Sequence, residues 1–198
     1  MVSFISSPKE LHFSQINKHS SKFFNIFLMP IQISFFNSPI GILEIKASNE
    51  FIHSLQFNST LKNPGTAVNR EIEEQHNHPI MVECERQLTA YFEGERKAFD
   101  LPFQQEGSAF QQQVWAELLH IPFGRTISYM ELSKRIKNVK AIRAVGTANG
   151  SNAISIVVPC HRVIGSNGNL TGYSGDLWRK KWLLDHEGKF ANGIQTLF

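Results

Sequence analysis

The chain has 198 residues but only two cysteines, Cys84 and Cys160, and it contains no CxxC pair. So low a count excludes a small scaffold held together by disulfides, and two separate free thiols favour a reducing compartment, so we expect a cytoplasmic protein. No apolar run approaches the roughly 20 residues that a membrane span needs. The short stretch FFNIFLMP has no small-residue cleavage site after it, so we expect neither a signal peptide nor a membrane partner.

The sequence also lacks the close groups of cysteine and histidine that zinc sites use. His76 and His78 have a metal-like spacing, but they lie in a polar stretch without cysteine partners. We therefore expect no metal.

Positive charge is unevenly spread along the chain, whose net charge is +3. Residues 1–100 carry 9 Lys and Arg against 11 Asp and Glu, whereas residues 101–198 carry 11 against 6. The second half, which holds Cys160, is therefore basic and favours an anionic partner. Solvated basic faces are common, so charge alone does not identify that partner.

Three short runs near the start of the chain alternate apolar and polar residues. They cover residues 31–36, 42–48 and 51–57 and are joined by tight polar turns, which predicts a three-stranded antiparallel sheet. The apolar members of the first run are Ile31, Ile33 and Phe35.

A helical pattern follows over residues 81–94 and stops at Gly94. The residues expected on its core face are Val82, Cys84, Leu88, Tyr91 and Phe92. Sheet and helix together predict a small N-terminal α/β domain over residues 29–100. Residues 1–28 show no sustained period and are predicted to be an appended, poorly ordered tail.

The second half has the pattern of a helical domain at residues 107–190, joined by a linker at 101–106 and followed by a tail at 191–198. A first helix is predicted within SAFQQQVWAELLHIPFG, where an apolar stripe is stopped by Pro122 and Gly124. The stripe consists of Phe110, Val114, Trp115, Leu118 and Leu119.

Two shorter helices come next. SYMELSKRI opens with Ser128 and Glu131 at the spacing of a capping box, and KAIRAVGTANG carries a face of small residues. That face consists of Ala141, Ala144, Val145 and Ala148. Two short helices around a tight turn are typical of a helix-turn-helix, although helix hairpins that never touch DNA share the pattern.

The stretch VVPCHRVIG places Cys160 directly after Pro159 and directly before His161 and Arg162. SIVVP has the pattern of a buried strand, and a cysteine at a strand end is usually a small hydrophobic residue. Pro159, however, is expected to end the strand and present the thiol, while His161 and Arg162 would lower its pKa. The glycine-rich GSNGNLTGYSGD that follows predicts a loop able to fold over a ligand.

Two classes of cysteine site fit these residues poorly. A cysteine hydrolase brings its base and its orienting group from elsewhere in the chain, whereas the nearest histidine here is adjacent to the cysteine. A zinc deaminase needs PCxxC with an upstream HxE, and the sequence has neither.

Several separate motifs resemble those of the O6-alkylguanine-DNA alkyltransferases, also called methylated-DNA–protein-cysteine methyltransferases. They are PCHRVIG after ANGSNAISIVV, FQQQVWAELLHIPFGRTISY upstream, and GYSG and KKWLLDHE downstream. The likeness extends over about residues 30–188 and is most specific over residues 108–187. It implies an α/β (α+β) protein with a ribonuclease H-like N-terminal domain and an all-helical C-terminal domain that carries the active-site cysteine.

The resemblance further implies a reaction and a partner. A cysteine thiolate takes the alkyl group from O6-alkylguanine, and also from O4-alkylthymine, in double-stranded DNA. Ordinary thiols do not reverse a thioether, so such a protein acts once, as a monomer and without a cofactor.

The resemblance assigns catalytic roles to five residues. Cys160 matches the nucleophile, His161 the base that deprotonates it through a water, and Glu187 the carboxylate that orients the histidine. Asn152 matches the asparagine that braces the active-site turn. Tyr129 matches the tyrosine that contacts the flipped base and helps to neutralise the leaving guanine.

A base pocket and a DNA surface are also implied by the resemblance. The pocket would be lined by Tyr173, by the carbonyl of Val163 and by the backbone N–H of Ser174. The target carbon is buried in stacked DNA, so the base must be flipped out, and Arg143 would fill the gap from a helix in the minor groove. The other implied DNA-contacting residues are Lys134, Arg135, Lys137, Lys140, Ala141, Ala144 and Ala148.

The chain departs from the resembled pattern at three positions. Asp176 stands where a second glycine usually follows YSG. Ala153 stands where proline is frequent, and so does Val139, just before the second helix of the helix-turn-helix pattern. Asp176 is the notable one, because it adds a carboxylate beside the lesion-binding loop and near the expected phosphates.

Two other functions remain open. A non-catalytic relative would bind alkylated guanine and flag it for other repair, but such proteins lack the cysteine, so Cys160 argues against this reading. A transcriptional regulator would bind one specific operator sequence through the helix-turn-helix, as a dimer. Neither the length nor the charge of the chain indicates an effector domain.

Overall fold

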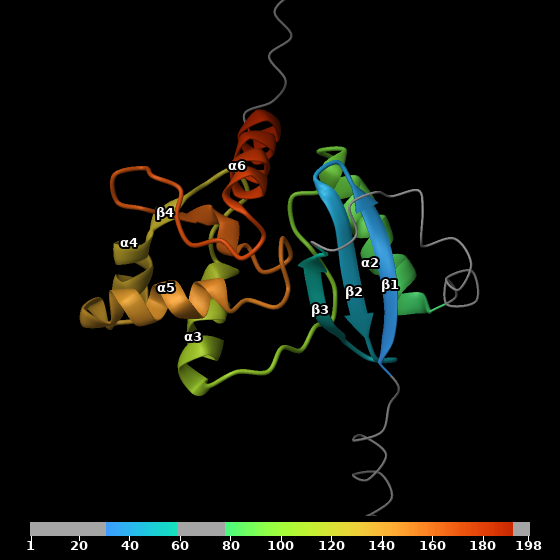
Figure 1. Cartoon of the computed structure of the whole chain (residues 1–198), viewed down its shortest axis with the longest axis horizontal. Helices are drawn as coiled ribbons and strands as arrows, with labels where there is room; N and C mark the ends of the chain where they lie inside the picture. Colours follow the sequence, from blue (N-terminus) through green and yellow to red (C-terminus); the bar gives the residue numbers. More distant parts are fainter. Residues whose placement is uncertain (1–30, 59–77, 192–198) are drawn as a thin grey trace, which may run out of the picture. The chain divides into compact units, whose positions relative to one another are not determined.

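The computed structural model describes residues 31–58 and 78–191, and Figure 1 labels their helices and strands. The first part is an antiparallel sheet in the order β1 (Gln32–Ser38), β2 (Gly41–Ala47) and β3 (Ile52–Phe57). The predicted three-stranded antiparallel sheet is thereby confirmed. The predicted tail at residues 1–28 lies outside the described residues.

Strand β1 faces the core with the side that carries Ser34 and Phe36. Ser34 is buried and its hydroxyl donates to Glu85 at 3.2 Å, while Phe36 stacks on Phe92. Ile31 and Ile33, two of the three apolar residues of the alternating run, are exposed. Alternation gives the period of a strand but not which of its two faces a neighbouring helix covers.

Helix α2 (Pro79–Phe92) packs against the sheet (Figure 1). Proline is well tolerated in the first turn, where the backbone N–H has no intrahelical acceptor. The predicted core positions Cys84, Leu88 and Tyr91 are fully buried, but Val82 is 50% exposed and its prediction was wrong.

The second part is predominantly helical. It contains α3 (Ala109–Leu118), α4 (Tyr129–Arg135), η2 (Val139–Ala141), α5 (Ile142–Gly150), η3 (Cys160–Arg162) and α6 (Leu177–Ala191). It also contains a short parallel pair of strands, β4 (Ile127–Ser128) with β5 (Val163–Ile164). The domain was expected to be all-helical, and this strand pair is the exception. Helices α4 and α5 pack together as the predicted helix-turn-helix pattern requires.

Local capping explains where these helices begin. Ser108 and Gln111 form a reciprocal capping box at the start of α3. At α4 only half of the predicted box is present, since Ser128 accepts from the backbone N–H of Glu131. Helix α3 ends at Leu118, which leaves Leu119 exposed rather than in the core as predicted.

The residues ahead of Cys160 do not form the predicted strand. They run through turns, with Ile156 at φ +72° in the left-handed region. One bridge joins this segment to β3: the Leu55 N–H donates to the carbonyl of Ala153 at 2.8 Å, and the Ser155 N–H donates to the carbonyl of Leu55 at 2.8 Å. Buried apolar residues there reflect burial from several sides rather than strand pairing.

The outer edge of β3 is also paired with the predicted linker. The Ile52 N–H donates to the carbonyl of Pro102, and the Gln104 N–H donates to the carbonyl of Ile52, both at 2.9 Å. Covering an edge strand in this way removes a template for aggregation. The domain boundary at 101–106 stays a prediction, but this segment lies along the sheet.

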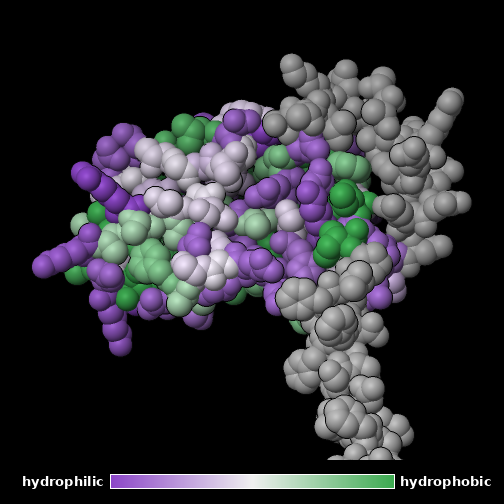
Figure 2. Space-filling model, turned by 60° about the horizontal axis from the view of Figure 1, so that its bottom comes forward, coloured by the Kyte–Doolittle hydropathy of each residue, from purple (hydrophilic) through white to green (hydrophobic). Residues whose placement is uncertain are grey.

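The face of the molecule in Figure 2 shows hydrophilic side chains interspersed with smaller apolar areas. Within residues 31–58 and 78–191, no helix combines the length and the apolar character that crossing a bilayer requires.

We expect Leu88→Ala and Val82→Ala to separate the two kinds of position on α2. Leu88 is fully buried, so its truncation should lower the free energy of unfolding by about 2–5 kcal/mol. The Val82 change should stay within about 0.5 kcal/mol. Urea unfolding checks this, and equal losses at both positions would contradict the packing described for α2.

Candidate active site

Cys160 lies at the start of η3, directly after Pro159, and its side chain is buried. The residue is 1% exposed, so the expectation that Pro159 presents the thiol to solvent was wrong. The turn places the thiol inside the fold, where Asn152 Nδ2 lies 3.1 Å from Sγ. Asn149 Nδ2 donates to the Cys160 carbonyl at 3.2 Å.

Asn152 braces this turn from several sides. Its Nδ2 lies 2.8 Å from the carbonyl of Val158, and its Oδ1 accepts from the Ile154 N–H at 3.0 Å. The side chain thus joins both ends of the turn to the thiol, as the resemblance implied.

Burial raises the pKa of the Cys160 thiol, while the Asn152 hydrogen bond and the Lys180 charge act in the opposite direction. The prediction that neighbouring cations lower this pKa therefore does not describe the resting protein. Loss of hydration outweighs the favourable groups, so the resting thiol is protonated at neutral pH.

Glu187 of α6 accepts hydrogen bonds from four residues, a set called here the Glu187 network. Oε1 lies 2.8 Å from His161 Nε2, 2.9 Å from Tyr91 Oη and 2.9 Å from Arg162 Nη2. Oε2 lies 2.9 Å from Arg162 Nε and 3.0 Å from the Gly124 nitrogen. A fully buried carboxylate is tolerated because every oxygen is paired with donors.

The network sets the protonation states around the thiol. Burial alone would raise the pKa of Glu187, but His161 and Arg162 together hold it well below its ordinary value. Burial lowers the pKa of His161, against the opposing effect of Glu187. A neutral imidazole beside an ionised carboxylate must donate from Nε2, which leaves the Nδ1 lone pair free. His161 Nδ1 is buried and has no hydrogen-bond partner among the described residues.

Three members of the Glu187 network were not predicted as site residues: Arg162, Tyr91 and Gly124, whose backbone N–H donates to the carboxylate. Arg162 was noted only as a cation next to the thiol, although its pairing with Glu187 is bidentate and its Nη1 donates to the Ile121 carbonyl at 2.6 Å. Tyr91 was predicted as core, because nothing in its helical spacing indicates a partner 96 residues away.

Lys180 is a further residue that the sequence analysis missed. Its Nζ is buried and donates to the carbonyls of Val163 at 2.6 Å and Thr171 at 2.7 Å. Burial lowers its pKa to about 8, against the effect of Cys160. The signal was present, since Lys180, Leu183 and Glu187 recur at helical spacing on the buried face of α6.

Tyr129 lies at the start of α4 and reaches the glycine-rich loop. Its hydroxyl donates to the carbonyls of Thr171 at 3.1 Å and Gly172 at 3.4 Å. Gly172 has φ +60°, and a Cβ there would lie 2.8 Å from Tyr129 Oη, so only glycine fits. A pocket of about 420 Å³ opens beside this contact, lined also by Arg143 and Gly146.

The remaining predicted pocket residues lie around the same loop. Burial raises the pKa of Tyr173 well above its ordinary value, and a thiolate at Cys160 acts in the same direction. The carbonyl of Val163 faces Lys180, as described above. Ser174 is exposed.

The predicted DNA-contacting residues do not share one surface. Lys140, Arg143 and Ala144 are exposed, and Ala141 is half-buried. Ala148 lies in the core, where its carbonyl accepts from Trp115 Nε1 at 2.7 Å, so its assignment to a DNA face was wrong. The small residues of KAIRAVGTANG thus divide between surface and core.

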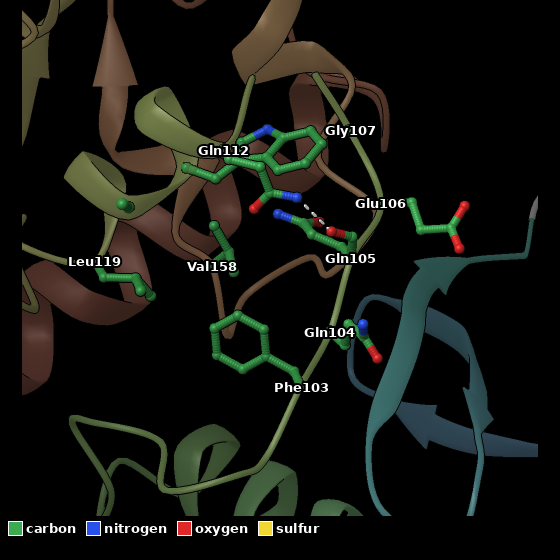
Figure 3. Close-up of a pocket in the computed structure, with 10 residues that line it drawn as sticks. Phe103, Gln104, Gln105, Glu106, Gly107, Gln112, Leu119 and Val158 are labelled. Atoms are coloured by element: carbon green, nitrogen blue, oxygen red, sulfur yellow. Dashed lines mark hydrogen bonds between the residues drawn. The ribbon is translucent and has the colours of Figure 1, made fainter. Parts of the chain in front are cut away.

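Figure 3 shows a second pocket, of about 500 Å³, that contains none of the predicted site residues. Gln112 Nε2 donates there to the carbonyl of Gln105 at 2.6 Å, and Gln105 Oε1 accepts from the Ala153 N–H. Within the described ranges, no group of three or more His, Cys, Asp and Glu side chains is placed to hold a metal ion. Of the two histidines with metal-like spacing, His76 lies outside those ranges, and His78 Nε2 is within 2.9 Å of Asn49 Oδ1.

The fold and the site define a class: a helix-turn-helix protein in which one buried cysteine lies beside a carboxylate-anchored histidine. Comparison with known proteins makes this specific. Residues 109–189 match the family model of the 6-O-methylguanine DNA methyltransferase DNA binding domain, and residues 31–105 match the ribonuclease-like domain of the same family. The chain therefore belongs to the 6-O-methylguanine DNA methyltransferase family, which confirms the resemblance and makes it a DNA-binding methyltransferase of DNA repair.

Curated relatives are similar in sequence to this chain over most of their own length. A methylated-DNA–protein-cysteine methyltransferase from Methanosarcina acetivorans is 44% identical over 77% of this chain and 96% of its own. One from Mycolicibacterium paratuberculosis is 42% identical over 82% of this chain and 95% of its own.

Solved structures share the fold. The crystal structure of Mycobacterium tuberculosis O6-methylguanine methyltransferase has a TM-score of 0.71 at 39% identity and covers 85% of this chain and 99% of its own. The crystal structure of Mycobacterium tuberculosis OGT in complex with DNA has a TM-score of 0.67 at 40% identity and covers 79% of this chain and 92% of its own.

Glu187→Gln should lower the free energy of unfolding by about 3–5 kcal/mol at pH 7, because it leaves Arg162 buried without its anion. The folded pKa of Glu187 lies below the unfolded value of about 4.3. Its stabilising contribution is therefore present above about pH 4.3 and is lost as pH falls toward the folded value.

Urea unfolding at pH 7 and pH 3 checks this, with Asp185→Asn as the control. Asp185 is exposed on the same helix and pairs only with Lys181 among the described residues. We expect its loss to change stability by no more than about 0.5 kcal/mol. A Glu187→Gln effect that is the same at both pH values would contradict the ionised, buried carboxylate.

Proposed function

We propose that Cys160 takes the alkyl group from O6-alkylguanine, and from O4-alkylthymine, in double-stranded DNA in a single-turnover reaction. One observation carries the proposal: His161, the residue that directly follows Cys160, is fixed to Glu187 through Nε2 and keeps a buried Nδ1 without a hydrogen-bond partner among the described residues. The relatives named methylated-DNA–protein-cysteine methyltransferases support the same reaction class.

In the proposed step the thiol proton passes through a water to His161 Nδ1. Cys160 Sγ forms a bond to the alkyl carbon as the bond from that carbon to guanine O6 breaks, and the electron pair stays on the guanine. The leaving guanine takes one proton from the Tyr129 hydroxyl, and Tyr129 regains one from solvent while His161 gives up to solvent the proton it took from the thiol, so protons and charge balance. A stable thioether remains on the protein, which is then spent.

The resting site supports deprotonation that is coupled to lesion binding. Burial keeps the thiol protonated until a substrate is present. Lys180 supplies the nearby positive charge that favours the thiolate once it forms, since its charge lowers the pKa of Cys160. The hydroxyl of Tyr129 stays protonated, because burial raises its pKa, and so can serve as a donor.

In the proposal, the loop over residues 165–176 opens to give the alkylated base access to the thiol. Cys160 is buried, and the bonds from Tyr129 to Thr171 and Gly172 close the loop over α4. In the proposal the flipped base displaces these contacts. The base would then lie against Tyr173, the second lone pair of the Val163 carbonyl and the backbone N–H of Ser174.

The proposed DNA surface is the helix-turn-helix of α4 and α5 in the minor groove. Arg143 would fill the gap left by the flipped base, and the exposed Lys134, Lys137 and Lys140 would bind phosphates. Phosphate contacts carry no sequence information, which suits a protein that must find lesions anywhere. The proposal includes a monomer that acts in the cytoplasm and needs no cofactor.

Transfer of label from an O6-methylguanine duplex tests the proposal. We expect the wild-type protein to become labelled once per molecule on the peptide that contains Cys160, and Cys160→Ala to take up no label. Cys84→Ala is the matched control, because Cys84 is the other buried thiol and lies in α2. Lesion-specific binding without any labelling of wild type would contradict transfer and favour a non-catalytic lesion-binding protein.

Arg143→Ala should weaken binding to a lesion-containing duplex by about tenfold, or about 1.4 kcal/mol, through loss of a DNA contact. Arg86→Ala is the control, since Arg86 is exposed on α2 and pairs with Glu83. Band-shift titrations at fixed salt measure both. Equal affinities for the two variants, or strong preference for one unmodified sequence, would contradict the proposed surface.

A further inference from the structure

Asp176 ends the glycine-rich loop in an unusual backbone conformation. Its φ is +70°, in the left-handed region that favours glycine and is tolerated by aspartate at some cost. The carboxylate is not left to repel DNA, because Oδ2 accepts from Arg179 Nη1 at 2.7 Å. Asp176, which stands where the family usually has glycine, thus forms an ion pair with Arg179.

Arg179 connects this end of the loop to the sheet. Its Nε donates to the carbonyl of Ile40, in the turn between β1 and β2, at 2.8 Å. Its Nη1 also lies 3.4 Å from the carbonyl of Gly175. One guanidinium therefore bonds the loop backbone, the loop carboxylate and a turn more than 130 residues away in the chain, with a side chain only 12% exposed.

Aromatic rings hold the guanidinium from two directions. Its central carbon lies 4.8 Å from the ring centroid of Phe57 in β3 and 4.6 Å from that of Trp178. Such contacts fix the plane of an arginine and favour it over lysine.

Close packing leaves the loop little freedom at this point. A Cβ on Gly175 would lie 2.8 Å from Phe57 and 2.9 Å from Tyr173. Gly41 has φ +115°, and a Cβ there would lie 3.1 Å from Arg179 Nη2. Glycines at both positions allow the loop and the turn to approach the guanidinium.

We propose that Arg179 is a positioning residue that anchors the lesion-binding loop to the N-terminal sheet. The anchor fixes the end of the loop at Gly175 and Asp176, so that Tyr173 and Ser174 face the base when the contacts of Tyr129 with the preceding residues 171 and 172 open. The inference rests on the proposed function, because the loop is taken to hold the alkylated base. It assigns the sheet a part in transfer beyond stabilising the fold.

The test compares Arg179→Met and Arg179→Lys with Lys181→Met as the control. Lys181 is exposed on the same helix and pairs with Asp185. Three quantities are measured for each full-length protein: the transfer rate constant at saturating O6-methylguanine duplex, the affinity for an unmodified duplex, and amide hydrogen exchange of the peptide over residues 172–177.

Arg179→Met should lower the saturated rate constant by about tenfold, because misplaced contacts to a reacting group cost this much or more. It should leave affinity for unmodified duplex within about twofold and speed exchange of the loop peptide. Arg179→Lys should recover only part of the rate, since lysine keeps the charge but not the planar fork. Lys181→Met should match wild type in all three.

A double-mutant cycle with Asp176→Gly separates positioning from general stability. If Arg179 acts through the loop, Asp176→Gly should slow transfer in wild type and add little in the Arg179→Met background. An unchanged rate constant in Arg179→Met overturns the inference, as does a loss that matches the unfolded fraction alone. If wild type transfers no label at all, the proposed function fails and the positioning role fails with it, whereas the exchange data still report whether the anchor holds the loop.

Discussion

The buried carboxylate of Glu187 is the feature on which the rest of this structure depends. An isolated carboxylate inside a protein is strongly disfavoured, so it persists only where donors replace its water. Here the donors come from segments far apart in the chain: Tyr91 from α2, Gly124 from the loop after α3, and His161 with Arg162 from η3. Satisfying one anion therefore brings together the sheet module, the helical part and the residues around the cysteine.

From this arrangement follow the protonation states that the chemistry requires. The carboxylate is ionised and holds His161 by Nε2, and burial keeps the imidazole neutral, so Nδ1 carries no proton and can act as the proposed base. Burial also keeps the Cys160 thiol protonated, which protects it from adventitious reaction. The N-terminal sheet supports this site through Tyr91 and through the pairing of Leu55 with the segment ahead of Cys160. It is therefore part of the active-site scaffold, and the anchor at Arg179 extends the same relation to the loop.

Sequence reasoning succeeded where neighbours in the chain decide the outcome. The adjacency of Cys160 and His161, the cap at Ser128 and the alternation in β2 are local patterns, and each corresponds to a feature of the structure. The family resemblance supplied Asn152 and Glu187, which the structure brings to the cysteine and the histidine.

The predictions that failed depend on contacts between distant segments. The exposed Val82 in α2 has an apolar side chain at helical spacing, but only one face of that helix packs against the sheet. The thiol of Cys160 was expected at the surface, but it is buried in a turn that Asn152 braces from several sides. Tyr91 could not be identified as a site residue, since its hydrogen bond is to a residue near the other end of the chain.

Nitrogen NMR of the histidine side chains tests the central claim most directly. The chain has 8 histidines, so the His161 signal is assigned from its disappearance in His161→Gln. At pH 7 we predict a neutral imidazole that is protonated on Nε2 and bare on Nδ1, with little change as pH is lowered toward 6. An imidazolium at pH 7, or a proton on Nδ1, would contradict the account, because His161 could then not accept the proton of Cys160.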